Sequence, residues 1–409
     1  MIYFSCNKCR MKTDIFCFLN DCYTSGSSRS WKRTFWKTPL RSSQGTSPSS
    51  NPVKNLIPLR ACKTPWVLVC FLFFSTFSVI AQTSKEYKLR TVAFYNLENL
   101  FDTKNDTLIF DDDRTPEGKD RWTKERFNKK IANLAKVLSE IGSEFSQTSP
   151  DIIGVCEVEN KQVLLDLINH PLLKEKNYGI VHADSPDERG IDVGLLYKKS
   201  AFIPLNFDSR RLLLTDADEK RNYTRDQLVI EGILDDEKIF FLVNHWPSRS
   251  GGELRSRPYR LKAAELNKRI IDSIRRLHMN ARIIGMGDFN DDPTDPSFKK
   301  VLGVKGKKKQ LDSLDLFGPM EKLFKKGFGS LAYRDRWNLF DQIYMSANLV
   351  GESEDSFYYW KVGIFTPAYL MDSKGKYKGY PLRTYAGGSY IGGYSDHFPV
   401  YVYLIKEVN

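Results

Sequence analysis

Residues 283–291 read IIGMGDFND, a short apolar run that ends in polar side chains. Such a run is typical of a buried strand, and Gly285 and Gly287 remove side-chain bulk where the strand ends. Asp288 and Asn290 follow, two residues apart. Side chains at positions i and i+2 of an extended chain point the same way, so we expect both to face one site at the mouth of a sheet. Because Gly-Asp also occurs in many turns, this stretch needs partners from elsewhere in the chain.

Other predicted strands end in polar groups in the same manner. The apolar stretches at residues 89–95, 151–156 and 238–243 are each followed within a few residues by amides, acids or an imidazole. Each such residue alone is more often a turn cap or a satisfied core residue. Together they offer hard oxygen donors and two imidazoles, which suit Mg²⁺, Mn²⁺ or Ca²⁺ better than Zn²⁺. The candidate site residues are Asn96, Glu98, Glu157, His245, Asp288, Asn290, Asp341, Asp396 and His397.

Two further charged residues lie beside apolar strands. Asp192 is inside the apolar run 191–197, and a buried carboxylate needs a partner. Arg225 stands just before a strand predicted at residues 227–234. No serine or cysteine nucleophile motif accompanies the candidate site residues. Strands alternate loosely with hairpins and with amphipathic helices, such as the one predicted to start at Thr123, so we expect mixed sheets.

An apolar run from Trp66 to Ile80 follows several basic residues and precedes Ala81. This is the layout of a secretory signal peptide, and the run is shorter than the ~20 apolar residues of a membrane span. We therefore expect residues 54–81 to be a signal peptide that is cleaved after Ala81, with export to the periplasm or outside the cell. Residues 1–53 are then a low-complexity extension, misassigned upstream of the true start. The alternative is an uncleaved signal that anchors the protein to a membrane.

The formal charge of +12 divides unevenly at this cleavage point. Residues 1–81 hold 11 Lys and Arg against 2 Asp and Glu, whereas the remainder holds 51 against 48. Residues 82–409 are therefore nearly balanced, and their composition provides no strong electrostatic case for nucleic acid. Six of the 7 cysteines also precede the cleavage point, which leaves only Cys156 and excludes an internal disulfide in the mature chain.

Residues 357–394 are rich in tyrosine and contain two glycine pairs, which predicts a large loop that walls a substrate cleft. Stacking on nucleic-acid bases is one use of such aromatic side chains, and packing of the loop itself is the commoner one. The aromatic residues concerned are Tyr358, Tyr359, Trp360, Tyr385, Tyr390 and Tyr394.

Six motifs, in this order and each beside a predicted strand, resemble those of the endonuclease/exonuclease/phosphatase superfamily. Its members include DNase I-like nucleases, abasic-site endonucleases, sphingomyelinases and inositol-phosphate phosphatases. The resemblance covers residues 88–405, and Cys156 departs from the glutamine that the family commonly shows before its metal-binding glutamate. The motifs are Tyr95-Asn96-Leu97-Glu98-Asn99, Val155-Cys156-Glu157, Asn244-His245-Trp246, Gly287-Asp288-Phe289-Asn290, Phe340-Asp341-Gln342-Ile343 and Ser395-Asp396-His397.

The resemblance implies a DNase I-like fold, which is a four-layered α/β sandwich of two mixed β-sheets flanked by helices. Residues 82–409 would form one catalytic domain of a secreted bacterial-type member. The implied cofactor is Mg²⁺, with Mn²⁺ or Ca²⁺ as alternatives. Glu157 would be its main ligand, and the further ligands would be Asn96, Glu98 and Asp396.

The resemblance also implies catalytic roles. Asp288 and Asn290 would position the attacking water and the phosphate, and Asp341 would hold His397, which handles protons or stabilises the phosphorane. The remaining implied contacts are His245 on the scissile phosphate, Asp192 orienting His245, and Arg225 binding phosphate. An imidazole suits proton transfer because its unperturbed pKa is ~6.5.

Three functional hypotheses follow from these patterns. The first is an exported, Mg²⁺-dependent phosphodiesterase that acts as an endonuclease, with nucleic acid as its partner and no stable protein partner. The second is a phosphomonoesterase or a sphingomyelinase-like lipid phosphodiesterase. The third is a binding module that kept the fold without catalysis, although usable residues at all nine candidate positions argue against it. The fold alone would not decide among them.

Overall fold

The computed structural model describes residues 3–5, 85–216 and 218–408, and its strands follow the apolar stretches of the sequence. The long strand β2 (Glu86–Leu100) shows why. Val92 and Phe94 belong to the core between two sheets, whereas Ala93 and Tyr95 belong to the core between this sheet and its helices. This alternation is the period of two that an extended chain imposes on its side chains.

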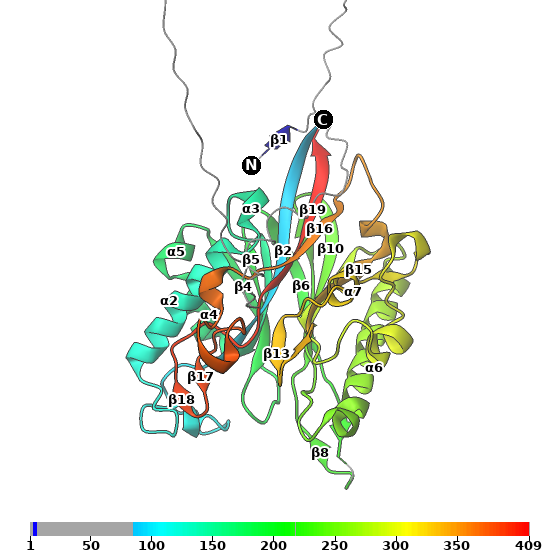
Figure 1. The fold of residues 1–409 in the computed structure, drawn as a ribbon. Helices are drawn as coiled ribbons and strands as arrows, with labels where there is room; N and C mark the ends of the chain where they lie inside the picture. Colours follow the sequence, from blue (N-terminus) through cyan, green and yellow to red (C-terminus); the bar gives the residue numbers. More distant parts are fainter. Residues whose placement is uncertain (1–2, 6–84, 217, 409) are drawn as a thin grey trace, which may run out of the picture. The chain divides into compact units, whose positions relative to one another are not determined.

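The first sheet places β2 near its centre (Figure 1). β2 runs parallel to its neighbour β3, and the other pairs on the path are antiparallel. A short strand, β1 (Tyr3–Ser5), pairs with the start of β2. In order, the six strands of the path are β16 (Tyr358–Ile364), β19 (Val400–Val408), β2, β3 (Ile152–Val158), β5 (Asp192–Lys198) and β4 (Tyr178–His182).

The second sheet has six strands, and only its central pair, β10 and β11, is parallel. Its order is β12 (Leu316–Phe317), β15 (Asp341–Ser346), β11 (Ile283–Asp288), β10 (Glu237–His245), β9 (Gln227–Leu234) and β6 (Phe202–Arg210). Small two-stranded sheets pair β7 (Leu214–Thr215) with β8 (Arg221–Asn222), β13 (Leu331–Tyr333) with β14 (Arg336–Asn338), and β17 (Tyr385–Ala386) with β18 (Ser389–Tyr390).

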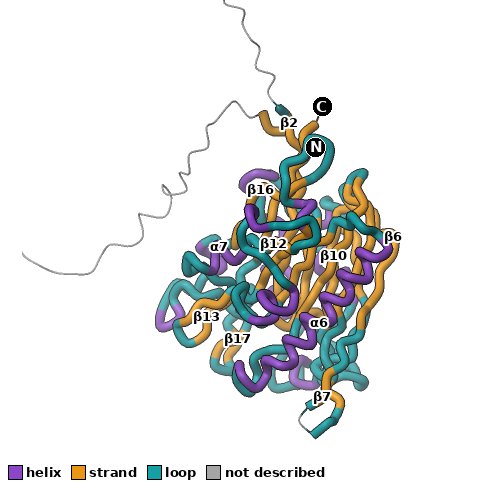
Figure 2. Tube along the Cα trace, turned by 90° about the vertical axis from the view of Figure 1, so that its right-hand side faces the viewer, coloured by secondary structure: helices purple, strands orange, loops and turns teal. Residues whose placement is uncertain are grey.

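Helices cover the outer face of each sheet. On the first sheet lie α2 (Lys124–Glu140), α3 (Ser143–Ser146), α4 (Lys161–Ile168) and α5 (Pro171–Lys174). On the second lies α6 (Glu253–Leu277), in front of β10 in Figure 2. Residues between the sheets form a separate apolar core. The four-layered sandwich of two mixed sheets that the sequence predicts is therefore confirmed. Shorter helical turns are Asp112–Arg114, Ser297–Leu302, Lys308–Gln310, α7 (Met320–Phe324), Ala347–Leu349, Ala368–Leu370 and Gly375–Tyr377.

One structural prediction is wrong in part. Residues 357–394 do not form a single loop, because Tyr358–Ile364 is strand β16 and pairs with β19. The glycine pair at 387–388 closes the β17–β18 hairpin, with both residues at positive φ. Tyr385 and Tyr390 pack edge to face across this hairpin at 5.5 Å. These tyrosines serve packing, which was the commoner of the two uses considered.

The expected extension (residues 1–53) and signal peptide (residues 54–81) lie outside the described residues, except for β1. Within the part of the chain that the structure describes, no helix is both long enough and apolar enough to span a bilayer.

Candidate active site

Three of the predicted site residues lie side by side in the second sheet. His245 ends β10, Asp288 ends β11 and Asp341 begins β15; the pairing registers place Asp288 opposite both His245 and Asp341. The strands approach closely here, because a Cβ on Gly287 would stand 2.4 Å from the carbonyl oxygen of Asn244. A glycine at this position is therefore required for the close approach of the backbone.

His397 reaches this row from the loop before β19. Its Nδ1 lies 2.6 Å from Asp341 Oδ2, and its Nε2 lies 3.8 Å from Asp288 Oδ2. Burial alone would lower the pKa of His397, but the carboxylates of Asp341 and Asp288 outweigh burial and hold the pKa well above its usual value. His397 is therefore a charged imidazolium near neutral pH, oriented from behind by Asp341.

His245 has the opposite protonation state. Burial lowers its pKa well below the usual value, helped by the positive charges of Arg225, Arg189 and His397. Its Nε2 stands 3.7 Å from Asp288 Oδ2 and 3.8 Å from Glu157 Oε1. His245 is thus a neutral imidazole between two carboxylates.

Asp288 is held by two amides. The backbone N–H of Asn290 donates to its Oδ1 at 3.0 Å, and the side-chain amide of Asn96 donates to its Oδ2 at 3.1 Å. Burial raises the pKa of Asp288 to about 7, with His397 acting in the opposite direction. A carboxylate with this pKa can accept a proton near neutral pH.

Glu157 faces the same site from the first sheet. The backbone N–H of Asn99 donates to its Oε2 at 3.0 Å, whereas no described residue donates a hydrogen bond to its Oε1. Glu157, Glu98 and Asn290 all have a left-handed backbone, with φ of 58°, 49° and 51°. Such conformations cost ~1–3 kcal/mol each and concentrate at functional sites.

The two remaining acids, Glu98 and Asp396, are already paired with cations. Lys130 Nζ lies 3.6 Å from Glu98 Oε2, and the backbone N–H of Thr384 donates to the same oxygen at 2.6 Å. Arg383 lies 3.6 Å from Glu98 Oε1 and donates to Asp396 Oδ2. Both acids therefore already share their charge with protein cations.

The donors at this site fit a hard divalent cation. Glu157 Oε1 accepts no hydrogen bond from a described residue and has only the longer contacts to His245 Nε2 at 3.8 Å and to Arg189 at 4.0 Å, although the side chain is only 14% exposed. Asn96 Oδ1 accepts one hydrogen bond, from the N–H of Glu98. Both are oxygens of the kind that Mg²⁺ prefers. Five carboxylates gather here, of which Glu98, Asp341 and Asp396 have cationic partners within the protein; the others are Glu157 and Asp288.

The tightest clusters of ionisable groups have a different membership. Among the described residues, side chains with ligand atoms within 4.8 Å of one another are Cys156–His245–Asp288, Asp288–Asp341–His397 and His182–Asp184–Asp192. In the second cluster His397 and Asp341 already hydrogen-bond each other. Burial raises the pKa of the Cys156 thiol well above its usual value, so it stays neutral in the first. The predicted carboxylates Glu98, Glu157 and Asp396 do not form such a trio.

Asp192 does not orient His245, contrary to the expectation. Its Oδ2 lies 3.1 Å from His182 Nε2, and its Oδ1 accepts the N–H of Ser185 at 2.7 Å. The β4–β5 register pairs His182 with Gly194, which makes Asp192 a diagonal neighbour on the same face, within reach of His182.

Arg225, which was expected to bind phosphate, is bonded to other groups of the protein. It is buried, lies 2.9 Å from Asp187 Oδ2, and donates to the carbonyl oxygens of His245 and Trp246 at 3.3 and 2.8 Å. These bonds fix the end of β10 beneath the imidazole of His245.

Several supporting residues have little signal in the sequence. Arg383 comes from a loop far along the chain, and Arg249 and Arg260 both hold Asp291 just after β11. Lys130 does have a signal, because it lies three residues after Phe127 and four before Leu134, on the buried face of α2. A lysine on the apolar stripe of a helix predicts a buried partner.

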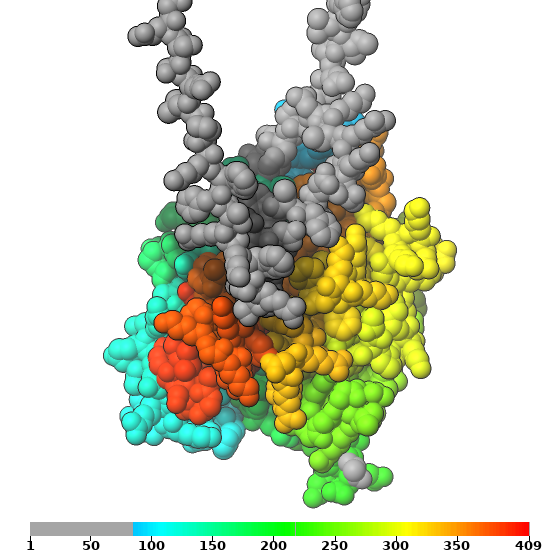
Figure 3. All heavy atoms as spheres, viewed as in Figure 1, coloured from blue at the N-terminus to red at the C-terminus, as the bar shows by residue number. Residues whose placement is uncertain are grey.

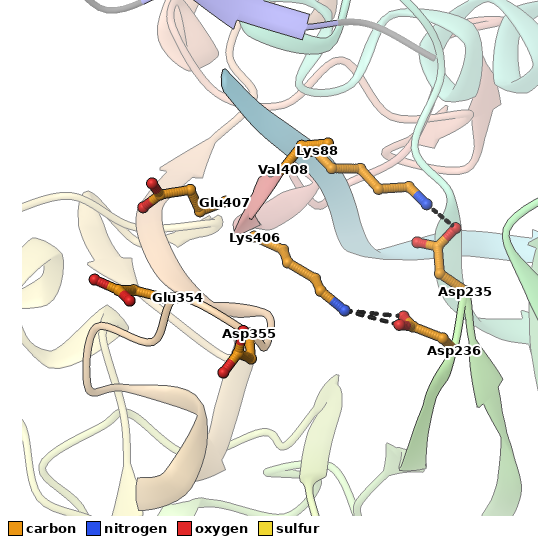
Figure 4. A pocket seen from close by; sticks show the side chains of 8 residues that line it. All are labelled: Lys88, Asp235, Asp236, Glu354, Asp355, Lys406, Glu407 and Val408. Carbon is orange, nitrogen blue, oxygen red and sulfur yellow. Dashed lines mark hydrogen bonds and ion pairs between the residues drawn. The ribbon is translucent and has the colours of Figure 1, made fainter. Parts of the chain in front are cut away.

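A cavity of about 500 Å³ lies at the opposite end of the strands (Figure 4). Lys88 near the start of β2 pairs there with Asp235, and Lys406 near the end of β19 pairs with Asp236. Lys88 precedes Asn96 by eight residues of extended chain, or about 25 Å. This cavity is therefore remote from the site built above.

The sequence profile of the Endonuclease/Exonuclease/phosphatase family matches residues 91–406. The chain belongs to this family. Enzymes of the family hydrolyse phosphoester bonds and generally depend on a divalent metal, so this protein is a phosphoester hydrolase. The predicted membership is confirmed. No curated protein sequence matches the chain.

Solved structures of the family are similar to this chain. An endonuclease/exonuclease/phosphatase family protein from Bacteroides thetaiotaomicron is 17% identical, covering 79% of this chain and 100% of its own, with a TM-score of 0.47. A mannosyl-6-phosphatase from the same organism is 18% identical, with coverages of 77% and 99% and a TM-score of 0.46. Humanized D. rerio TDP2 is 14% identical, with coverages of 77% and 98% and a TM-score of 0.46.

The metal-free protein is expected to lose stability as pH rises from about 4 to about 7. Asp288 keeps its proton up to a pKa of about 7 when folded, whereas an unfolded Asp releases it near ~3.9. Between these values only the folded state holds the proton, so raising the pH favours unfolding. Thermal unfolding in EDTA at pH 5 and pH 7.5 should show this fall in the wild type and a smaller fall in Asp288→Asn. An equal fall in thermal stability between pH 5 and pH 7.5 in the wild type and in Asp288→Asn would contradict this prediction.

Lys130→Met is expected to lower the free energy of unfolding by about 3–5 kcal/mol, because it leaves the Glu98 carboxylate buried beside no ammonium. Lys130 also donates to Thr384 Oγ1 and to the carbonyl oxygen of Tyr394. Urea unfolding should show a smaller loss in the Lys130→Met/Glu98→Gln double variant. The neighbouring exposed lysine provides a matched control, Lys129→Met, which should be near neutral.

Proposed function

We propose that this protein is an exported, Mg²⁺-dependent phosphodiesterase that cleaves internal bonds of nucleic acid. The observation that carries the hydrolytic part is the pair of His397 and Asp341, 2.6 Å apart, beside the carboxylates of Asp288 and Glu157. No serine or cysteine nucleophile is needed, because water is the nucleophile in metal-assisted hydrolysis.

Glu157 and Asn96 would hold the metal ion, with Glu98 as a further acid beside them. When bound, the ion would offset negative charge on the phosphate and orient it. Asp396, which was also predicted to be a ligand, is paired with Arg383 and would contribute to the site by holding this arginine beside it.

The other steps of hydrolysis are assigned to Asp288, His397 and His245. Asp288 and His397 are 3.8 Å apart, so one water or one phosphoryl oxygen can contact both. Asp288 accepts the proton of the attacking water, and the charged His397 offsets the negative charge that develops on the phosphoryl oxygens. Neutral His245 donates a hydrogen bond to a phosphate oxygen. As the water oxygen bonds to phosphorus, the bond to the leaving oxygen breaks.

A diester substrate is favoured over a monoester by the space beside the site. A cavity of about 670 Å³ adjoins Asp396 and Arg383, and both tyrosine and basic side chains line it. The single substituent of a monoester can also enter this cavity, but its tyrosine and basic side chains suit the bases and further phosphates of a nucleic-acid strand.

The purified protein should nick supercoiled plasmid in Mg²⁺ and should lose this activity in excess EDTA. Parallel assays should include single-stranded DNA, RNA, phospholipid and small phosphate esters. Release of inorganic phosphate from sugar or inositol phosphates without nicking would assign the monoesterase alternative. Turnover that persists in EDTA would remove the metal from the proposal.

A further inference from the structure

The cavity of about 670 Å³ lies beside the site, and of the predicted site residues only Asp396 lines it. It lies between the β13–β14 hairpin and residues 372–391, which lie next to each other in gold and in orange to red in Figure 3. Asp396 and Arg383 form its inner wall. Because Asp396 Oδ1 is 3.9 Å from His397 Nε2, a substituent on a phosphate held at His397 can enter this cavity.

The cavity offers exposed tyrosine rings with a cation beside each of them. Tyr333 is 62% exposed and Tyr377 is 49% exposed. The guanidinium of Arg334 lies 5.2 Å from the ring centre of Tyr333, and the ammonium of Lys376 lies 5.7 Å from that of Tyr377. Neither cation forms an ion pair with any residue that the structure describes. Exposed rings beside positive charge suit a flat π system attached to phosphate.

The carboxylates of the cavity are already used by the protein. Asp335 accepts a hydrogen bond from the hydroxyl of Tyr380 at 2.6 Å, and Asp372 accepts the N–H of Lys374 at 3.0 Å. Asp396 accepts from Arg383. A sugar ring would need such acceptors for its hydroxyl groups, whereas a stacked base needs ring faces. Only one oxygen of Asp335 and one of Asp372 is used in this way, so the preference for a base rests on the exposed rings of Tyr333 and Tyr377.

The hairpin that carries Tyr333 is held rigid at both ends. At its tip, Arg334 and Asp335 have φ of 50° and 62°, a two-residue turn for which Asn-Gly is preferred. The hydroxyl of Tyr380 accepts the N–H of Asp335 at 2.8 Å and fixes this strained tip. Retained backbone strain of this kind is a feature of ligand clamps.

At its base, the hairpin is bonded to the catalytic strands through Ser330. The N–H of Asp341 donates to Ser330 Oγ at 3.2 Å, and the N–H of Phe398 donates to the Ser330 carbonyl oxygen at 2.8 Å. Phe398 directly follows His397. The position of Tyr333 is therefore tied to both members of the His397–Asp341 pair.

We infer that the Tyr333–Tyr377 cavity is a stacking subsite for the base next to the scissile phosphate, which makes single-stranded nucleic acid the preferred substrate. This inference rests on the proposed phosphodiesterase function. A base in a duplex is already stacked and paired, so only an unpaired strand can place a base against one of these rings without added cost.

The test is binding of a short fluorescein-labelled oligothymidylate to the full chain in EDTA, followed by anisotropy. Tyr333→Leu and Tyr377→Leu should each weaken binding about 5- to 150-fold, because stacking on an aromatic ring contributes about 1–3 kcal/mol per base. The matched variants Tyr333→Phe and Tyr377→Phe keep the ring and should bind like the wild type. An abasic strand of equal length should bind the wild type as weakly as the leucine variants bind the normal strand.

Equal binding of normal and abasic strands by the wild type would overturn the inference without any variant being needed. So would leucine variants that fold normally and bind like the wild type. Because the assay requires no turnover, base-dependent binding without hydrolysis would instead count against the proposed function. Nicking activity with no base-dependent binding would leave that function standing and remove this subsite.

Discussion

Replacing Asp341 with asparagine is expected to lower kcat about 10²–10⁴-fold with little change in KM. The carboxylate lies 2.6 Å from His397 Nδ1 and is a main cause of the raised pKa of that histidine. Asparagine keeps the shape but removes the negative charge, so His397 loses its proton at a lower pH. The alkaline limb of the pH–rate profile should therefore move to lower pH, which a purely structural defect would not cause.

Asp192→Asn is the matched control for this substitution. Asp192 also pairs with a buried histidine, since its Oδ2 lies 3.1 Å from His182 Nε2. The two variants thus remove the same kind of contact from different places in the fold. We expect Asp192→Asn to retain a kcat close to the wild type and an unshifted pH profile. Equal losses in both variants would show that the His397–Asp341 pair has no special role.

Replacing Glu157 with glutamine is expected to lower activity by at least about 100-fold, because a metal ion contributes several kcal/mol and each ~1.4 kcal/mol is a factor of ten. The same change should leave the metal-free protein as stable as the wild type or more stable, because it removes one charge from a crowded group of acids. Glu157 Oε1 accepts no hydrogen bond from a described residue, and its nearest cation, the half-exposed Arg189, is 4.0 Å away, so the substitution removes only a weak ion pair.

Thermal unfolding with and without Mg²⁺ measures this second prediction. Wild-type protein should gain about 2.7 kcal/mol at a Mg²⁺ concentration of 100 times Kd, and Glu157→Gln should gain much less. Glu159→Gln is the matched control, because Glu159 lies two residues away and accepts the N–H of Asp102 outside the cluster. Burial raises its pKa to about 8, so glutamine changes little charge. A full Mg²⁺ response in Glu157→Gln would exclude Glu157 as a ligand.

The candidate site combines rigid strands with strained ends. His245, Asp288 and Asp341 occupy one row because the strand registers place them there. Glu98 and Glu157, near the ends of β2 and β3, and Asn290, just after β11, have left-handed backbones, at a cost in stability. That arrangement turns side chains of two different sheets toward one point, which regular strands could not achieve alone.

The residues that pair with Asp192 and Arg225 were not predicted from the sequence. Asp192 was expected to orient His245 and Arg225 to bind phosphate, whereas the structure pairs each of them with another residue of the protein. Asp192 contacts His182 because β4 lies beside β5. Arg225 contacts Asp187, which lies in the loop between β4 and β5. The local sequence around Asp192 and Arg225 does not predict these partners, because they come from strands and loops that only the tertiary structure brings together.

The tyrosines show the same limit. Tyr385 and Tyr390, two of the six aromatic residues named for the predicted cleft wall, pack against each other in the β17–β18 hairpin. The exposed rings at the cavity are Tyr333 and Tyr377. The sequence does not distinguish a tyrosine that packs in the interior from one whose ring is exposed in a cavity, because this depends on the residues that surround it in the fold.

The sequence by itself determined the strands and the polar residues that end them, because the period-two alternation of apolar side chains is a local property of extended backbone. Its motifs also determined the family, and with it the four-layered fold. The tertiary structure decided which of these polar groups share one site, which are braces, and which cations balance the acids. Those choices depend on registers between strands and on burial, which involve residues far apart in the chain and have no local signature.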